Sequence, residues 1–272
     1  MSKSPLISII TVNLNNLEGL RKTMKSVFEQ SWQEFEYIII DGGSSDGSRE
    51  FIEAKKDKID YWVSEPDKGI YNAMNKGIKA ANGEYLLFLN SGDWFCNEKV
   101  IENVFDKLGT CDVLYGNMIK VFPDAREILD RGEKGEEISL KTFMERTLNH
   151  SASFIKKGLF MKYGLYDEGL KIVSDWKFFL ISLGLNNSGV SYIDLPISYF
   201  DMTGISNRNL KLRNQERKLV IDKVVPSPLY IDYLKLKEYE KVVDLSRVRK
   251  FQKIDQITIF RKSFSLIFKL FS

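Results

Sequence analysis

The sequence predicts an α/β fold with a mainly parallel central sheet flanked by helices. Several short apolar runs are unbroken by polar residues, which is the pattern of strands covered on both faces. These runs alternate with segments of helical period, and that alternation predicts βαβ units. Right-handed crossovers then bring the carboxyl ends of the strands, and the turns that follow them, to one edge of the sheet.

The first part of the chain supplies most of this alternation. Its expected strands are Leu6–Val12, Phe35–Ile40, Tyr61–Val63 and Tyr85–Leu89. The helix after the first strand is expected to begin with a capping box of Asn15 and Glu18. Further helices are expected over Ser48–Ala54 and from Gly69 onward.

The second part of the chain is less regular. Asp112–Val121 has a strand pattern, and the charged, glycine-containing segment 122–141 is expected to be a mobile loop. Ser174 is expected to cap a helix rich in aromatic residues.

Composition excludes several classes of protein. A chain of 272 residues is expected to form one large domain, or one domain with an appendage. The two cysteines, Cys96 and Cys111, give no disulfide framework and fit a reducing cytoplasm. One histidine excludes a histidine-rich zinc site. No apolar run approaches the roughly 18 residues that a membrane span requires.

The charges are unevenly distributed along the chain. Residues 208–272 carry 16 Lys and Arg against 7 Asp and Glu, whereas the preceding residues carry 24 against 30. A mildly acidic body with a basic tail suggests an anionic partner for the tail.

Three polar turns follow the buried strands and are expected to converge: Thr11–Asn13, Asp41–Asp46 and Asn90–Asp93. Ligands of open α/β sheets bind just beyond such strand ends, so the carboxylate of Asp93 lies where chemistry is expected. Gly69 opens a helix whose backbone N–H groups could face an anion.

Four motifs in this order resemble glycosyltransferase family 2, the inverting sugar transferases with the GT-A fold. The motifs are Ser8–Asn13, Ile39–Ser48, Asp67–Ile78 and Gly83–Asp93. The resemblance implies a GT-A domain over residues 1–206, followed by a basic helical extension over 207–272. It also implies transfer of a sugar from a nucleotide sugar, UDP-linked, to a hydroxyl acceptor with inversion.

The resemblance assigns a nucleotide site to the first half. Asp41 would accept a hydrogen bond from the uracil N3–H, and the turn containing Thr11 and Asn13 would lie against the base. The alternative for Asp41 is a turn cap.

The third helix carries the next candidates for that site. Lys68 and Gly69 could neutralise the diphosphate, or Lys68 could be a solvated loop residue. Asn75 matches the family's Asn-Lys-Gly-Ile element.

Asp93 occupies the last position of the family's acidic metal motif. The motif often has acids where this chain has Asn90 and Gly92. The implied cofactor is a divalent cation, Mn²⁺ or Mg²⁺, which one carboxylate, two phosphate oxygens and water could hold. The alternative is a turn aspartate.

Asp175 matches the family's general base, which takes the proton of the acceptor hydroxyl. The alternative is an aspartate that stabilises the start of its helix.

His150 and Trp176 are candidates for lining the acceptor cleft, with a structural histidine and a packing tryptophan as the alternatives. Arg208, Lys211 and Arg213 could fold over the leaving diphosphate or form a solvated helical face.

The implied setting is cytoplasmic assembly of bacterial surface polysaccharide on a lipid-linked saccharide acceptor, with no nucleic acid as partner. In the tail, Ile257, Phe260 and Phe264 fall on one helical face. A helix of this kind could attach the protein to the anionic inner face of the membrane, pack on the body, or form a homodimer.

Two rival functions remain. One is a nucleotide-sugar-binding protein that has lost catalysis, which the depleted acidic motif allows. The other is a nucleotidyltransferase, which the absence of a glycine-rich phosphate loop after the first strand disfavours.

Overall fold

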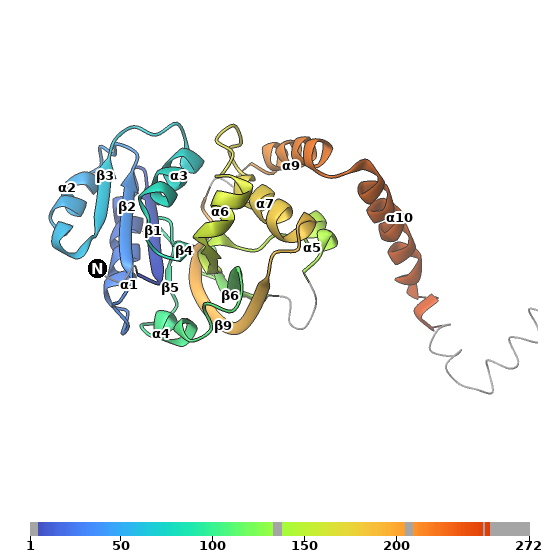
Figure 1. Ribbon diagram of the computed structural model, residues 1–272, viewed down its shortest axis with the longest axis horizontal. Helices are drawn as coiled ribbons and strands as arrows, with labels where there is room; N and C mark the ends of the chain where they lie inside the picture. Colours follow the sequence, from blue (N-terminus) through green and yellow to red (C-terminus); the bar gives the residue numbers. More distant parts are fainter. Residues whose placement is uncertain (1–4, 133–137, 205–208, 247, 251–272) are drawn as a thin grey trace, which may run out of the picture. The chain divides into compact units, whose positions relative to one another are not determined.

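A mixed nine-stranded sheet forms the centre of the computed structural model, which describes residues 5–132, 138–204, 209–246 and 248–250 (Figure 1). The strand order is β3-β2-β1-β4-β8-β6-β9-β5, and β7 pairs with β6. The strands are β1 Ile7–Asn13, β2 Glu36–Asp41, β3 Tyr61–Ser64, β4 Tyr85–Phe88, β5 Trp94–Phe95, β6 Val113–Val121, β7 Glu127–Asp130, β8 Ser153–Lys156 and β9 Val190–Asp201.

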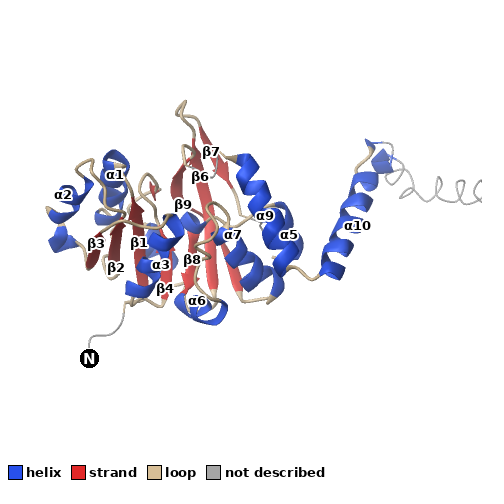
Figure 2. Cartoon of the chain, turned by 90° about the horizontal axis from the view of Figure 1, so that it is seen from above, coloured by secondary structure: helices blue, strands red, loops and turns tan. Residues whose placement is uncertain are grey.

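Helices cover both faces of this sheet (Figure 2). The helices that the structure describes are α1 Leu17–Phe28, α2 Ser48–Glu53, α3 Ile70–Ala80, α4 Val100–Phe105, α5 Leu140–Glu145, α6 Lys157–Tyr163, α7 Ser174–Phe179, α9 Leu210–Val224 and α10 Ser227–Val243. Short helical segments occur at Lys56–Lys58, His150–Ala152 and Leu180–Leu185.

The half of the sheet formed by β1 to β4 is parallel, as predicted. β1 pairs with β2 and β4, and β2 pairs with β3. Neighbouring residues of β1 point to opposite faces: Ile9 belongs to the core that includes Leu20 of α1, whereas Ile10 lies against Gly77 of α3. Covering both faces is what the unbroken apolar strands require.

The other half of the sheet mixes directions. β8 runs antiparallel to both β4 and β6, and β9 runs parallel to β6. The prediction of a loop throughout residues 122–141 is wrong, because β7 returns antiparallel to β6. Asp124 and the left-handed Ala125 make the turn of this hairpin, and an ion pair of 2.6 Å between Lys120 and Asp130 closes it.

Two predicted helix caps are also wrong. The side chain of Asn16, not Asn15, accepts the capping bond of α1 from the Gly19 N–H. Asn15 has a φ of 48° and instead accepts a hydrogen bond from the Ser45 N–H. Val173 precedes α7 as its cap residue, while the Ser174 hydroxyl accepts a bond from the Asp167 N–H.

The chain forms two compact units, Met1–Ile221 and Asp222–Ser272. The first unit extends past residue 206, and the domain boundary expected there from the sequence stays a prediction. The second contains all of α10, and the apolar tail helix expected from Ile257 lies outside the described residues. Among the described residues, no helix has both the length and the apolar character needed to cross a membrane.

Candidate active site

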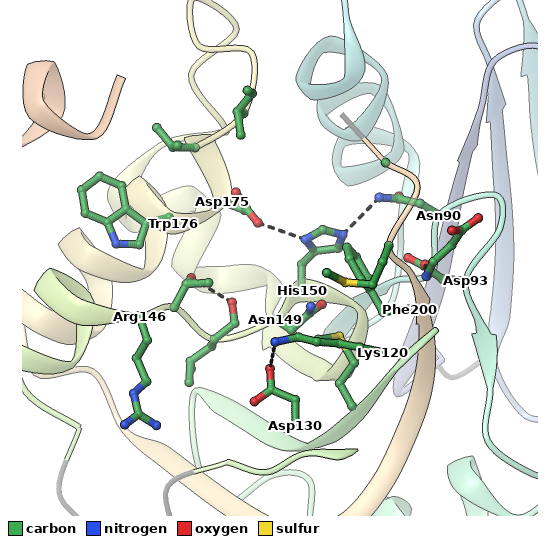
Figure 3. Close-up of a pocket in the computed structure, with 18 of the residues that line it drawn as sticks. Asn90, Asp93, Lys120, Asp130, Arg146, Asn149, His150, Asp175, Trp176 and Phe200 are labelled. Atoms are coloured by element: carbon green, nitrogen blue, oxygen red, sulfur yellow. Dashed lines mark hydrogen bonds and ion pairs between the residues drawn. The ribbon is translucent and has the colours of Figure 1, made fainter. Parts of the chain in front are cut away.

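A cavity of about 470 Å³ lies beyond the carboxyl ends of β4 and β9, beside the first turns of α3 and α7. Asp93, His150, Asp175 and Trp176 all line it (Figure 3). The structure thus brings together the predicted metal ligand, the predicted base and both predicted cleft residues.

Asp175 lies in the first turn of α7 and is held by two donors. The Tyr71 hydroxyl donates to Oδ1 at 2.9 Å, and Nδ1 of His150 lies 3.0 Å from Oδ2. Burial alone would raise the pKa of Asp175. The hydrogen bond and charge of His150, together with the bond from Tyr71, outweigh burial and hold this pKa below its usual value. The carboxylate is therefore ionised and still has lone pairs for a hydroxyl proton.

His150 connects Asp175 to the turn after β4 (Figure 3). Its Nε2 lies 3.1 Å from the amide nitrogen of Asn90. Burial would lower the pKa of His150, but the adjacent Asp175 carboxylate raises it above the usual value.

The Asn90 amide can serve both charge states of this imidazole. Its Nδ2 donates to a neutral ring. A rotated amide would offer a protonated ring the buried Oδ1, which has no hydrogen-bond partner in the part of the chain that the structure describes. Asn90 thus has a function at the position where the family motif often has an acid.

Asp93 is a buried carboxylate beside a second carboxylate. Its side chain is 4% exposed, and Oδ1 accepts a hydrogen bond of 3.0 Å from the Asp201 N–H. Burial, assisted by the negative charge of Asp201, raises the pKa of Asp93 to about 7. A buried acid of this kind is stabilised by a nearby cation.

Asp201 is a residue that the sequence reasoning missed. It ends β9, and the turn after this strand is closed by its Oδ1, which accepts a bond of 2.8 Å from the Thr203 N–H. The available signal was an acid directly after the last apolar strand, the same signal that identified Asp93.

Asp93 and Asp201 suit a hard divalent cation, because carboxylate oxygens are the ligands that Mg²⁺ and Mn²⁺ prefer. The described residues contain no group of three or more His, Cys, Asp or Glu arranged to hold a metal. Diphosphate oxygens and water would therefore have to complete the coordination.

The predicted base-contacting residue Asp41 organises its own turn. It is fully buried and accepts four hydrogen bonds, from the Asn13 amide, the Ser44 N–H and hydroxyl, and the Ser64 hydroxyl. Burial would raise the pKa of Asp41, but these bonds hold it below its usual value. A uracil N–H would have to displace one of these donors.

Asn13 offers a more available acceptor at this turn. Its Oδ1 is buried and lacks a hydrogen-bond partner among the described residues, although its amide nitrogen is held by Asp41. The Thr11 hydroxyl lies inside the sheet, where it bonds the Leu89 carbonyl at 2.8 Å and the Tyr37 hydroxyl. The structure therefore gives the Thr11 side chain a packing role.

The candidates in and just before α3 do not line the cavity. Lys68 and Gly69 are exposed and do not line it; Gly69 has a φ of 126°, which favours glycine. The Asn75 amide is buried, where it bonds both the N–H and the carbonyl of Tyr166 and also the Glu168 carboxylate. These contacts make Asn75 a bridge between α3 and the loop before α7, and its expected nucleotide role stays a prediction.

Trp176 packs rather than presenting a free face. It is 2% exposed, its indole N–H donates to the Phe143 carbonyl at 2.7 Å, and the Arg217 guanidinium lies 4.7 Å from its ring centroid.

Comparison with known proteins decides the family. Residues 8–164 match Glycosyl transferase family 2. An uncharacterized glycosyltransferase of Mycobacterium tuberculosis is 37% identical over 213 residues, which cover 76% of this chain and 79% of that protein. The chain belongs to glycosyltransferase family 2.

Solved glycosyltransferases share the fold of this family 2 chain. Staphylococcus aureus TarS 1-349, crystallised with UDP, has a TM-score of 0.59 and 21% identity, covering 72% of this chain and 60% of that one. The mannosyltransferase PcManGT from Pyrobaculum calidifontis, in complex with GDP-Man and Mn²⁺, has a TM-score of 0.63 and 12% identity, covering 82% and 65%. The chain thus spans less than two thirds of either protein, and the likeness confirms the predicted GT-A fold.

In this family 2 member, Asn90 and Gly92 stand where the acidic motif often has acids, and the local structure accounts for both. Gly92 has a φ of 105°, a conformation that strains any residue with a side chain. Asn90 holds His150, and Asp201 supplies the second carboxylate beside Asp93.

Proposed function

We propose that this chain transfers a sugar from a UDP-linked nucleotide sugar to a hydroxyl acceptor with inversion. One observation carries the proposal: the carboxylate of Asp175 is held by Tyr71 and His150 in the same cavity as Asp93. An inverting displacement needs one carboxylate on the face opposite the leaving group.

Asp175 would take the proton of the acceptor hydroxyl as that oxygen bonds to the anomeric carbon. The bond from this carbon to the diphosphate oxygen breaks at the same time, and its electron pair leaves with the diphosphate. Tyr71 and His150 keep the carboxylate ionised and oriented, so that little reorganisation is needed when the acceptor arrives.

The donor would lie on the side of Asp93 and Asp201. These residues would hold Mn²⁺ or Mg²⁺, and the cation would supply positive charge to the leaving diphosphate. The complexes of TarS with UDP and of PcManGT with Mn²⁺ support this assignment. The free Oδ1 of Asn13 would accept the N–H of the base.

The proposed setting is assembly of surface polysaccharide on a lipid-linked saccharide, with the basic tail attaching the protein to the inner face of the membrane. This part rests on the family resemblance and on the excess of Lys and Arg over residues 208–272.

Two measurements test the proposal. A thermal-shift screen against UDP-, GDP- and dTDP-sugars with Mn²⁺ should give the largest shift with a UDP-sugar, and failure of every nucleotide sugar to bind would overturn it. Nucleotide release should then rise when a lipid-linked saccharide acceptor is added. Donor binding without release under any acceptor would instead identify a binding protein that has lost catalysis.

A further inference from the structure

Two arginines of α9 line the cavity on the side of Asp175. Arg213 and Arg217 are one helical turn apart and so lie on the same face of α9. Arg217 lies over the ring of Trp176, the neighbour of Asp175 in α7.

Asp175 and Trp176 lie on one side of His150, whereas Asn90 and Asp93 lie on the other (Figure 3). The arginines are therefore on the side away from the proposed cation.

Helix α9 is firmly held in this position. Glu216, between the two arginines, is 8% exposed, and its carboxylate accepts bonds of 2.8 Å and 2.9 Å from the N–H groups of Lys171 and Ile172. Val220, one turn further on, is 2% exposed. Because α9 is anchored to the segment that leads into α7, the arginines have a fixed relation to Asp175.

Both guanidinium groups have unused hydrogen-bonding capacity. The Nε atoms of Arg213 and Arg217 are buried and have no hydrogen-bond partner among the described residues. Within the same residues, no carboxylate lies at ion-pair distance from either group, although Arg217 Nη2 donates to the Arg146 carbonyl at 3.3 Å. Burial and the charge of Arg213 lower the pKa of Arg217, and the negative charge of Asp175 offsets this only in part. Two adjacent cations with buried, unpaired donors cost stability until an anion binds.

The balance of charge in the cavity also favours an anion. Its lining contains six Lys and Arg side chains against four Asp side chains. A nucleoside diphosphate and a divalent cation bring opposite charges of similar size, so together they leave this cationic excess largely uncompensated.

We propose that Arg213 and Arg217 form an oxyanion subsite for the acceptor, which therefore carries a phosphate or carboxylate group near the hydroxyl that reacts. The proposal rests on the proposed function, since it takes Asp175 as the base. A guanidinium group binds either oxyanion through two parallel N–H bonds, which would satisfy the buried Nε atoms. This subsite would select anionic acceptors over neutral ones.

The test uses inorganic phosphate and acetate as probes on the full chain, with and without saturating UDP and Mn²⁺. We expect one of the probes to bind the UDP-loaded protein, as seen by calorimetry, and the preferred probe to identify the group on the acceptor. Arg213→Gln should weaken this binding by about tenfold or more, the effect of losing one charge-assisted hydrogen bond. Lys218→Gln, which removes a charge from an exposed position of the same helix, should leave it unchanged.

Two further variants, which keep the positive charge, control for misfolding. Arg217→Lys and Arg213→Lys keep the charge but lose the paired geometry, so each should also weaken probe binding. The proposal is overturned if UDP excludes the probes, because the arginines would then belong to the donor diphosphate. It is also overturned if the arginine variants bind as tightly as wild type, or if Lys218→Gln weakens binding equally. If no nucleotide binds but phosphate still requires Arg213, the proposed donor function fails while the oxyanion site stands.

Discussion

Two carboxylates in one cavity can differ in pKa because their neighbours differ. Asp175 and Asp93 line the same cavity, yet the pKa of Asp175 is below its usual value while that of Asp93 is raised to about 7. The difference arises because Asp175 receives hydrogen bonds from Tyr71 and His150, whereas Asp93 receives one backbone bond and faces Asp201. The first environment suits a proton acceptor that stays ionised, and the second suits a cation ligand.

Asp93→Asn should abolish metal-supported UDP binding and leave the fold intact, because it removes the charge that the cation needs. Calorimetric titration of UDP with and without Mn²⁺ measures this. Asp130→Asn is a matched control, since Asp130 lines the same cavity but pairs with Lys120. An affinity within a factor of about 3 of wild type, less than 1 kcal/mol, would contradict the assignment.

Asp175→Asn preserves the shape of the side chain and removes proton acceptance. Transfer should fall by roughly 10²-fold or more, the usual scale for loss of a general base. Donor affinity should change little, as measured by the same titration. If turnover survives and donor affinity falls instead, Asp175 belongs to the nucleotide site and another group is the base.

His150→Gln should move the acidic limb of the transfer pH profile to higher pH. The positive charge and hydrogen bond of His150 lower the pKa of Asp175, so their loss lets that pKa rise. Profiles of kcat/KM for wild type and variant, at saturating metal, provide the measurement. An unmoved limb would mean that His150 does not set the charge of Asp175.

The same variant has a stability consequence with a defined pH window. The pKa of His150 is raised and that of Asp175 is lowered on folding. The pair therefore stabilises the protein fully between the unfolded pKa values of about 3.9 and about 6.5. Its contribution is lost as pH rises through the folded pKa of His150 and as pH falls through that of Asp175, so the Tm difference should be smaller at alkaline pH.

At the level of elements, helix α3 connects the sheet to Asp175, the proposed general base. Gly77 lets α3 approach β1 closely, because a Cβ there would lie 2.5 Å from a methyl carbon of Ile10. Asn75 ties the same helix to the Tyr166–Glu168 segment, and Tyr71 in its first turn reaches Asp175. The orientation of the Asp175 carboxylate thus depends on how α3 packs against β1.

Asn75→Ala should lower the free energy of unfolding by about 1–3 kcal/mol, since it leaves buried backbone groups of Tyr166 unpaired. Urea unfolding measures the change, and UDP affinity should be unaffected. Asn72→Ala is the control on the same helix, because Asn72 is partly exposed and its bonds, to the Glu168 carboxylate and from the Lys68 N–H, are also exposed. Unchanged stability with weaker UDP binding would instead support the nucleotide role expected from the sequence.

These elements show what the sequence could and could not predict. Apolar runs and the polar turns after them predicted the parallel strands and the position of Asp93, because both signals are local. The contacts of Asp93 with Asp201 and of Tyr71 with Asp175 join residues 108 and 104 positions apart, which no local pattern encodes. The contacts of Asn75 with Tyr166 and Glu168 could not be predicted for the same reason: the sequence pattern around a helical amide side chain is the same whether the amide faces a ligand or a loop.

At the scale of the whole molecule, charge separates the two ends of the chain. The residues before 208 have an excess of acids, and the residues from 208 onward have an excess of Lys and Arg. Two of these basic residues, Arg213 and Arg217, line the cavity and belong to the first compact unit. The larger part belongs to the second unit, where the proposed membrane attachment would use it.

Removing the end of the chain tests that attachment. Residues 247–272 carry 7 Lys and Arg against 1 Asp, and Phe260, Phe264 and Phe271 fall on one face of a helical projection. Basic charge and apolar side chains act together at an anionic surface, and the electrostatic part weakens with salt. Full-length protein should therefore sediment with anionic vesicles at low salt and dissociate as salt rises, while a chain ending at Val248 stays in solution. Equal sedimentation of both chains, or binding that salt does not change, would exclude an electrostatically assisted anchor. If truncation instead halves the mass measured in solution, the tail joins two copies of the protein.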